Sequence, residues 1–261
     1  MIVHLDLHCR AFVRHRSVRN GLTTVAAATI NAREGEMMRI GILGTGTLAE
    51  ALGGGWARAG HELVIGGRSQ AKAQRLADRL GRGVRAVAPR EAVTGRDAVL
   101  LAVLWDGVDE MLRSAGASEG SLDGTPLIDP TNAVEHGVGV LLTGRDEAMA
   151  ERIAVLAPGA HVVKAFHLFA AEQWTRAPGQ NERPVTVAMC GDDPAALEVV
   201  SELVRDVGGV PAVLGSLDRV RQLEEVAGFV IGLAFAGFDP ASAVPRVPSP
   251  ATPRLPRESR A

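Results

Sequence analysis

A glycine-rich segment is the part of the chain whose residue types and spacing point most directly to chemistry. It reads Gly44-Thr45-Gly46-Thr47-Leu48-Ala49, the pattern G-x-G-x-x-A, and follows an apolar run at residues 40–43. In a strand–turn–helix context the first glycine permits a tight turn and the second lets a pyrophosphate approach the backbone. Amides at the helix N-terminus can then bind phosphate oxygens. Residues 44–48 therefore predict a dinucleotide site, the alternative being a glycine turn that binds no nucleotide.

A second candidate group follows the next apolar run and indicates which dinucleotide binds. An NAD site usually carries a carboxylate about 20 residues past the glycines, where it binds the ribose hydroxyls. No acidic residue occurs between Glu62 and Asp78, whereas Arg68, Ser69 and Lys72 lie in this interval. A forked cation, a hydroxyl group and a second cation suit a 2′-phosphate better than a bare hydroxyl. This set favours NADP, and the alternative is a solvated arginine beside a surface turn.

The glycine loop and the cations near Arg68 can meet at one edge of a sheet only if strands and helices alternate along the chain. Strand patterns occupy residues 40–43, 62–65, 84–87, 98–103, 126–128, 162–165, 185–190 and 211–214. Helical patterns lie at residues 48–59, 70–80, 147–156, 194–207 and 217–238. Such alternation predicts an α/β fold, a doubly wound Rossmann-type sheet with a small C-terminal strand-helix-strand-helix extension. The last helix is expected to be core or a dimer interface.

The composition excludes several classes of protein. The 261 residues carry a net charge of −2, so no excess of positive charge indicates a nucleic-acid-binding protein. Two cysteines cannot form a disulfide framework or a thiolate metal cluster, and we expect no metal site. The chain contains no tyrosine, which excludes mechanisms with a tyrosine acid. An apolar fraction of 46% is ample for a large core.

The two ends of the chain differ from the middle. Residues 1–36 are rich in arginine and are expected to be a disordered or mis-started extension, because Met37 and Met38 immediately precede the first strand. Residues 239–261 hold six of the fourteen prolines and are expected to be a disordered tail. Residues 37–238 then form the NAD(P)-binding domain, with a small C-terminal part for the second substrate.

Several segments, taken in order, resemble the NADPH-dependent reductases of the deazaflavin coenzyme F420. The first two of these segments are the glycine loop and the turn at Arg68. The others, in chain order, are Ala102-Val103-Leu104-Trp105, Asp129-Pro130-Thr131-Asn132, Lys164-Ala165-Phe166-His167, Gly191-Asp192-Asp193 and Arg221-Gln222-Leu223-Glu224. The resemblance runs from about residue 38 to residue 238. Gly67 and Leu104 depart from the family pattern, which has serine and proline there. The resemblance implies NADP as cofactor and coenzyme F420 as co-substrate.

These later segments supply further candidate contacts, because the carboxyl ends of the strands bind ligands in doubly wound folds. We expect Ala102, Val103 and Trp105 to wall the adenosine and diphosphate side of the site. Pro130, Thr131 and Asn132 are expected to flank the nicotinamide, and His167 to donate to a cofactor phosphate or carbonyl. The alternatives are rim packing for Trp105 and a structural hydrogen bond for His167.

The sequence shows no general acid or base, and the expected reaction needs little proton transfer. A hydride passes from the nicotinamide to the deazaflavin ring, so the protein must stack two flat rings and exclude water. We therefore name no catalytic residue. A reductase of an imine or ketone and a non-catalytic NADP-binding sensor are the alternatives. We expect a cytoplasmic homodimer that binds small-molecule cofactors, with no nucleic-acid or membrane partner.

Overall fold

A single mixed sheet forms the centre of the part of the chain that the structure, a computed structural model, describes: residues 36–175 and 184–245. The strand order is β3-β2-β1-β4-β5-β6-β7-β8. All neighbouring strands pair in parallel except β6 and β7, which are antiparallel. The strands are β1 (Arg39–Leu43), β2 (Glu62–Gly66), β3 (Arg85–Val87), β4 (Ala98–Leu101), β5 (Pro126–Asp129), β6 (His161–Lys164), β7 (Thr186–Gly191) and β8 (Val210–Val213).

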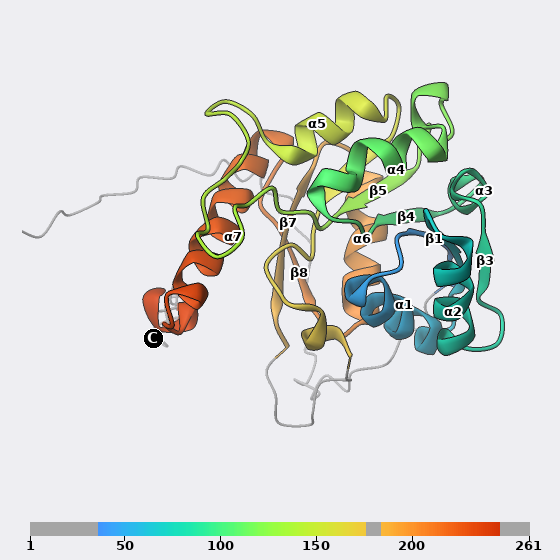
Figure 1. The fold of residues 1–261 in the computed structure, drawn as a ribbon, viewed down its shortest axis with the longest axis horizontal. Coiled ribbons are helices and arrows are strands. Elements are labelled where there is room, and N and C mark those ends of the chain that lie inside the picture. Colours follow the sequence, from blue (N-terminus) through green and yellow to red (C-terminus); the bar gives the residue numbers. More distant parts are fainter. Residues whose placement is uncertain (1–35, 176–183, 246–261) are drawn as a thin grey trace, which may run out of the picture. The chain divides into compact units, whose positions relative to one another are not determined.

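Helices cover both faces of this sheet, which confirms the predicted doubly wound α/β fold (Figure 1). One core cluster joins the sheet to α1, α2 and α6, and the other joins it to α3, α4, α5 and the start of α7. In Figure 1, α7 lies at the opposite end of the sheet from α1 and α2. The helices are α1 (Thr47–Ala59), α2 (Gln70–Leu80), α3 (Pro89–Val93), α4 (Val108–Ala115), α5 (Met149–Leu156), α6 (Pro194–Asp206) and α7 (Val220–Phe235).

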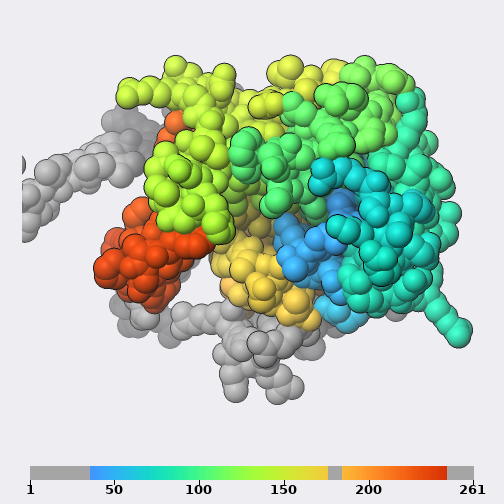
Figure 2. Space-filling model, in the orientation of Figure 1, coloured from blue at the N-terminus to red at the C-terminus, as the bar shows by residue number. Residues whose placement is uncertain are grey.

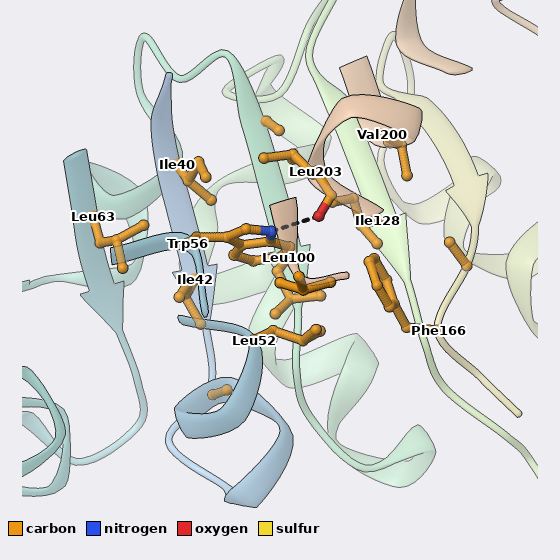
Figure 3. Packing of buried hydrophobic residues seen from close by; sticks show 14 of the residues in the cluster. Ile40, Ile42, Leu52, Trp56, Leu63, Leu100, Ile128, Phe166, Val200 and Leu203 are labelled. Carbon is orange, nitrogen blue, oxygen red and sulfur yellow. Dashed lines mark hydrogen bonds between the residues drawn. The ribbon is translucent and has the colours of Figure 1, made fainter. Parts of the chain in front are cut away.

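The central strands are apolar on both faces because both faces are covered. In β1, Ile40 and Ile42 face the α1 side, whereas Leu43 belongs to the cluster on the α3 side. Trp56 of α1 is fully buried in the first cluster, and its indole Nε1 donates to the carbonyl of Leu203 at 2.9 Å (Figure 3). The one polar atom of this large side chain thus has a partner, so its burial is fully favourable.

The structure corrects several boundaries and adds elements. Each predicted strand and helix is present within a few residues, but β4 ends at Leu101 rather than at residue 103, and α7 ends at Phe235. The short helices α3 and α4 were not predicted, because each spans only about two turns or fewer and gives little periodic signal. The C-terminal strands do not form a separate layer, since β7 pairs with β6 and extends the same sheet.

Beyond α7, the structure differs from the sequence expectation over a few residues. Pro240–Ala243 form a 3-10 helix, because the side chain of Asp239 caps its N-terminus and Pro240 occupies the first turn. Residues 246–261 of the predicted tail, and all but one residue of the 1–36 extension, lie outside the described residues. Among the helices that the structure describes, none has the length and apolar character to cross a membrane. The homodimer and the cytoplasmic location stay predictions.

Candidate functional site

A groove of about 810 Å³ runs along the carboxyl ends of β1, β2, β4 and β5. In Figure 2, blue atoms of the first strand–helix unit, cyan atoms of the second and green atoms around α4 meet on the face that is drawn. Fourteen of the fifteen predicted cofactor contacts line this groove: Gly44, Thr45, Gly46, Thr47, Leu48, Arg68, Ser69, Lys72, Ala102, Val103, Trp105, Pro130, Thr131 and Asn132. The sequence segments that were expected to meet therefore form one continuous surface.

The glycine loop has the geometry that a pyrophosphate requires. Gly44 has φ +131°, and a Cβ there would lie 2.0 Å from the carbonyl oxygen of Ala102, so only glycine fits. Its N–H donates to the carbonyl of Gly66 at 2.8 Å, which fixes the turn. A Cβ on Gly46 would meet no protein atom within 4 Å and would enter the groove. Because Gly46 is also the N-cap of α1, open space lies beside helical amide donors, which suits phosphate oxygens.

The adenosine end of the groove carries two cations and a helix N-terminus. Arg68 ends the loop after β2, and Ser69 is the N-cap of α2, where its Oγ accepts from the amide of Lys72. The Ser69 hydroxyl keeps its own hydrogen to donate to a ligand. No acidic residue lies in the first turn of α2, so the positive end of the helix dipole adds to the two cations. These groups fit a phosphate dianion.

Glu110 of α4 modifies this end in a way that the sequence did not reveal. The carboxylate of Glu110 accepts from the guanidinium of Arg68 at 3.0 Å, and both side chains are more than half exposed. A 2′-phosphate that binds the same nitrogen of Arg68 must therefore replace this carboxylate. The contact joins residues 42 positions apart, and no local pattern could have shown it.

The other end of the groove is built by the loop after β5. Pro130, Thr131 and Asn132 line it, and the Asn132 Nδ2 donates to the carbonyl of His167 at 2.7 Å. Because a carbonyl oxygen can only accept, the Asn132 side-chain atom that faces His167 must be the nitrogen and the other must be the oxygen. The Asn132 Oδ1 is buried and has no partner among the described residues. An acceptor held in this way fits a ligand amide or hydroxyl donor.

His167 is the one predicted contact that the structure does not place on the groove. Its side chain is 5% exposed, and neither ring nitrogen has a hydrogen-bond partner within the described part of the chain. Burial, together with the charge of Lys164, lowers the pKa of His167 to about 3, so the ring is neutral at ordinary pH. The backbone carbonyl of His167, not its ring, serves the site by holding Asn132.

Phe166 explains this orientation. It has φ +63°, the left-handed conformation that a bulky residue rarely adopts. Its ring is buried and makes edge-to-face contacts with Trp56 and Trp174, at centroid distances of 6.2 Å and 5.3 Å. This packing holds the unusual backbone turn that follows β6, and Figure 3 shows Phe166 in the same cluster as Trp56. A sequence gives no signal for positive φ at phenylalanine.

The groove also contains residues that sequence reasoning did not select. Most adjoin predicted ones, so a contiguous reading of each loop would have found them: Gly67, Leu104, Asp106, Gly107 and Met111. Leu104, which stands where the resembled family has proline, is 77% exposed. Asp106, Arg68 and Lys72 are the ionisable side chains that line the groove within the described ranges, and none of them lies on the β5 loop. In the same ranges, no cluster of three His, Cys, Asp or Glu side chains could hold a metal ion.

Comparisons with known proteins agree with this geometry. Residues 39–133 match the family described as NADP oxidoreductase coenzyme F420-dependent. A structure from Arthrobacter sp. FB24, described as a candidate F420-dependent NADP-reductase, has a TM-score of 0.65 and 26% sequence identity. That likeness covers 77% of this chain and 96% of the other. The predicted resemblance and the α/β fold are thereby confirmed.

Two further comparisons concern other kinds of reductase. The metalloreductase STEAP3 of Rattus norvegicus is 29% identical over 191 residues, which are 73% of this chain. The chain spans only 36% of that relative's length. An imine reductase from Myxococcus stipitatus, in complex with NADP+, has a TM-score of 0.58 at 18% identity, over 76% of this chain and 63% of the other. At that identity the likeness concerns the fold alone.

Proposed function

We propose that the chain is an NADP-dependent oxidoreductase related to the coenzyme F420-dependent family, and that it transfers a hydride reversibly between NADPH and a deazaflavin of the F420 type. The observation that carries the proposal is the unpartnered Oδ1 of Asn132, among the described residues, at the opposite end of the groove from Arg68 and Lys72. One end of the groove suits a 2′-phosphate, and the other offers an acceptor to the nicotinamide carboxamide.

The chain's own residues bind and orient the two substrates. The turn at Gly44 and the amides that follow Gly46 hold the diphosphate, while Arg68, Ser69 and Lys72 bind the 2′-phosphate. Asn132, fixed through its Nδ2, orients the carboxamide and so presents one face of the nicotinamide ring. When bound, NADPH supplies the hydride to the deazaflavin ring carbon, and solvent supplies the balancing proton.

The choice of a deazaflavin over a carbonyl substrate is supported by what lies beside Asn132. A ketone reductase needs a proton donor at the alkoxide that forms. The loop of Pro130, Thr131 and Asn132 carries no ionisable side chain, and the nearby His167 is buried and neutral. A ring that accepts the hydride at carbon and spreads the charge requires no such donor. The family description of residues 39–133 adds to this argument.

The proposal is tested by mixing the full chain with NADPH and oxidised coenzyme F420 and following the visible absorbance of the deazaflavin. We expect this band to bleach with NADPH much faster than with NADH, and reduced F420 to regenerate NADPH from NADP+. Asn132→Trp, which fills the nicotinamide end, should abolish transfer and leave the affinity for 2′,5′-ADP unchanged. Tight NADPH binding without bleaching in either direction would refute the proposal.

The same assay separates the alternatives. Turnover of a small ketone or a cyclic imine, with no bleaching of F420, would identify a reductase of another small acceptor. NADPH binding without turnover of any acceptor would identify an NADP-binding protein without this activity.

A further inference from the structure

A fully buried ammonium group lies against the loop that borders the nicotinamide end. Lys164, the last residue of β6, has no exposed side-chain surface. Its Nζ lies 3.0 Å from Asp129 Oδ2 and 3.0 Å from Glu224 Oε1, and it also donates to the carbonyl oxygen of Thr131. Three acceptors use all three hydrogens of the ammonium group.

Burying an ammonium group and two carboxylates costs free energy, so we ask which part of the structure this cluster holds in place. Burial alone lowers the pKa of Lys164, but Asp129 and Glu224 outweigh it, so the pKa is raised and the charge is kept. Well-packed apolar residues often replace buried ion pairs without loss of stability, so packing alone does not explain the cluster. The contact that no apolar side chain could make is the one to the Thr131 carbonyl.

The cluster holds Thr131 at three atoms. Asp129 Oδ1 accepts from the Thr131 N–H at 2.8 Å and from its hydroxyl at 2.7 Å, while Lys164 binds the Thr131 carbonyl. The next residue is Asn132, whose side chain is fixed only through the His167 carbonyl within the described part of the chain. The hydrogen bond from Lys164 therefore fixes the orientation of the peptide group between Thr131 and Asn132. The direction of the Asn132 side chain depends on the orientation of that peptide group.

We propose that Lys164 is a positioning residue: its ammonium group, held by Asp129 and Glu224, orients the Thr131 peptide and so places Asn132 for the nicotinamide half of the cofactor. Glu224 also accepts from the amides of Met149 and Ala150, so the same carboxylate joins α7 and the N-terminus of α5 to this loop. The inference rests on the proposed function for the identity of the ligand, but its test does not require turnover.

The test compares two ligands that share one end of the groove. The full chain and Lys164→Met are titrated with NADPH and with 2′,5′-ADP, which carries the 2′-phosphate but lacks the nicotinamide half. We expect the variant to bind NADPH about 2- to 13-fold more weakly, the loss expected when the hydrogen bond that Asn132 offers is no longer in place. Its affinity for 2′,5′-ADP should stay within about twofold, because Arg68 and Lys72 are distant in the fold from the cluster.

Two further variants separate positioning from stability. Leu122→Ala opens a cavity in the core cluster on the α4 side, away from the packing of Trp56 and Phe166, and should lower the free energy of unfolding without changing the NADPH to 2′,5′-ADP affinity ratio. The double variant Lys164→Met/Asp129→Asn removes one of the two buried carboxylates that the single variant leaves without a cation, and Glu224 keeps two backbone amides as partners. The new side-chain amide at position 129 keeps an oxygen that can accept from Thr131. The double variant should regain part of the lost stability but not NADPH affinity, and it replaces the single variant in the titrations if Lys164→Met does not fold.

The outcomes are distinct. Equal weakening of both ligands, an unchanged affinity ratio, or recovery of NADPH affinity in the double variant would overturn the inference. If wild-type protein binds NADPH no more tightly than 2′,5′-ADP, the nicotinamide end itself fails, and with it the proposed function.

Discussion

Replacing Arg68 with alanine should weaken NADPH binding and leave NADH binding almost unchanged. Arg68 is the forked cation at the adenosine end of the groove, next to Ser69 at the N-terminus of α2. NADH lacks the 2′-phosphate, so removing Arg68 should remove no charge-assisted contact from that complex. The difference between the two nucleotides therefore isolates what Arg68 contributes to the recognition of the phosphate.

The magnitude follows from two contacts. A hydrogen bond to a charged group contributes roughly 1.5–3 kcal/mol. Against this, the phosphate must displace Glu110, which lies 3.0 Å from Arg68, and an exposed ion pair of this kind contributes about 0.2–1 kcal/mol. The net loss is roughly 0.5–2.8 kcal/mol, or about 2- to 110-fold in the dissociation constant for NADPH.

Titration calorimetry of wild type and Arg68→Ala with NADPH, NADH and 2′,5′-ADP measures this loss. Arg75→Ala is the matched control, because Arg75 is an exposed arginine on α2, the helix that follows Arg68, and does not line the groove. NADPH and 2′,5′-ADP should weaken by the same factor, and the control should weaken neither. Equal losses for NADH and NADPH would refute the reasoning and show that Arg68 supports the loop instead.

Three further predictions concern single side chains. Glu110→Gln should tighten NADPH binding by about 1.4- to 5-fold and leave the affinity for NADH unchanged, because the carboxylate no longer competes with the phosphate for Arg68. Weaker NADPH binding in the same titration would mean that Glu110 holds Arg68 in the orientation that binds the phosphate. Asn132→Leu should weaken NADPH by about 2- to 13-fold and spare 2′,5′-ADP, and an unchanged NADPH affinity would rule out a carboxamide contact. Because burial and then the charge of Lys164 lower the pKa of His167 from 6.5 to about 3, the unfolded chain binds a proton there that the folded chain does not. The free energy of unfolding therefore shows no loss from this group above pH 6.5, and it falls by up to about 1.4 kcal/mol per pH unit as the pH decreases toward 3. Urea unfolding of His167→Asn at several pH values should lack this slope. Parallel pH profiles for wild type and variant would contradict the assignment.

Sequence patterns predicted the parts of the site that depend on neighbours along the chain. The glycine loop, the N-cap at Ser69 and the cations at Arg68 and Lys72 each lie within one strand–helix connection, where spacing determines geometry. The doubly wound class of sheet needed no distant information either, because it follows from the alternation of strands and helices, whereas the strand order and the antiparallel pairing of β6 with β7 were not predicted.

Contacts between distant segments could not be predicted. Asn132 meets His167 across 35 residues, and Lys164 meets Glu224 across 60, although each of these residues was noticed as part of a motif. His167 was expected to point its ring at the cofactor. Instead, the left-handed turn at Phe166 places the carbonyl of His167 against the side chain of Asn132. Such a turn is held by tertiary packing, and no local preference indicates it.

Direct hydride transfer is the central claim, and isotope transfer tests it most directly. NADPH carrying deuterium at C4 of the nicotinamide, on the face that the enzyme uses, is incubated with the full chain and oxidised coenzyme F420 in ordinary water. Mass spectrometry of the reduced deazaflavin should find one deuterium for each molecule of NADPH oxidised, because the two rings stack with water excluded. Reduced deazaflavin without deuterium from either face, or no reduced deazaflavin at all, would contradict the account.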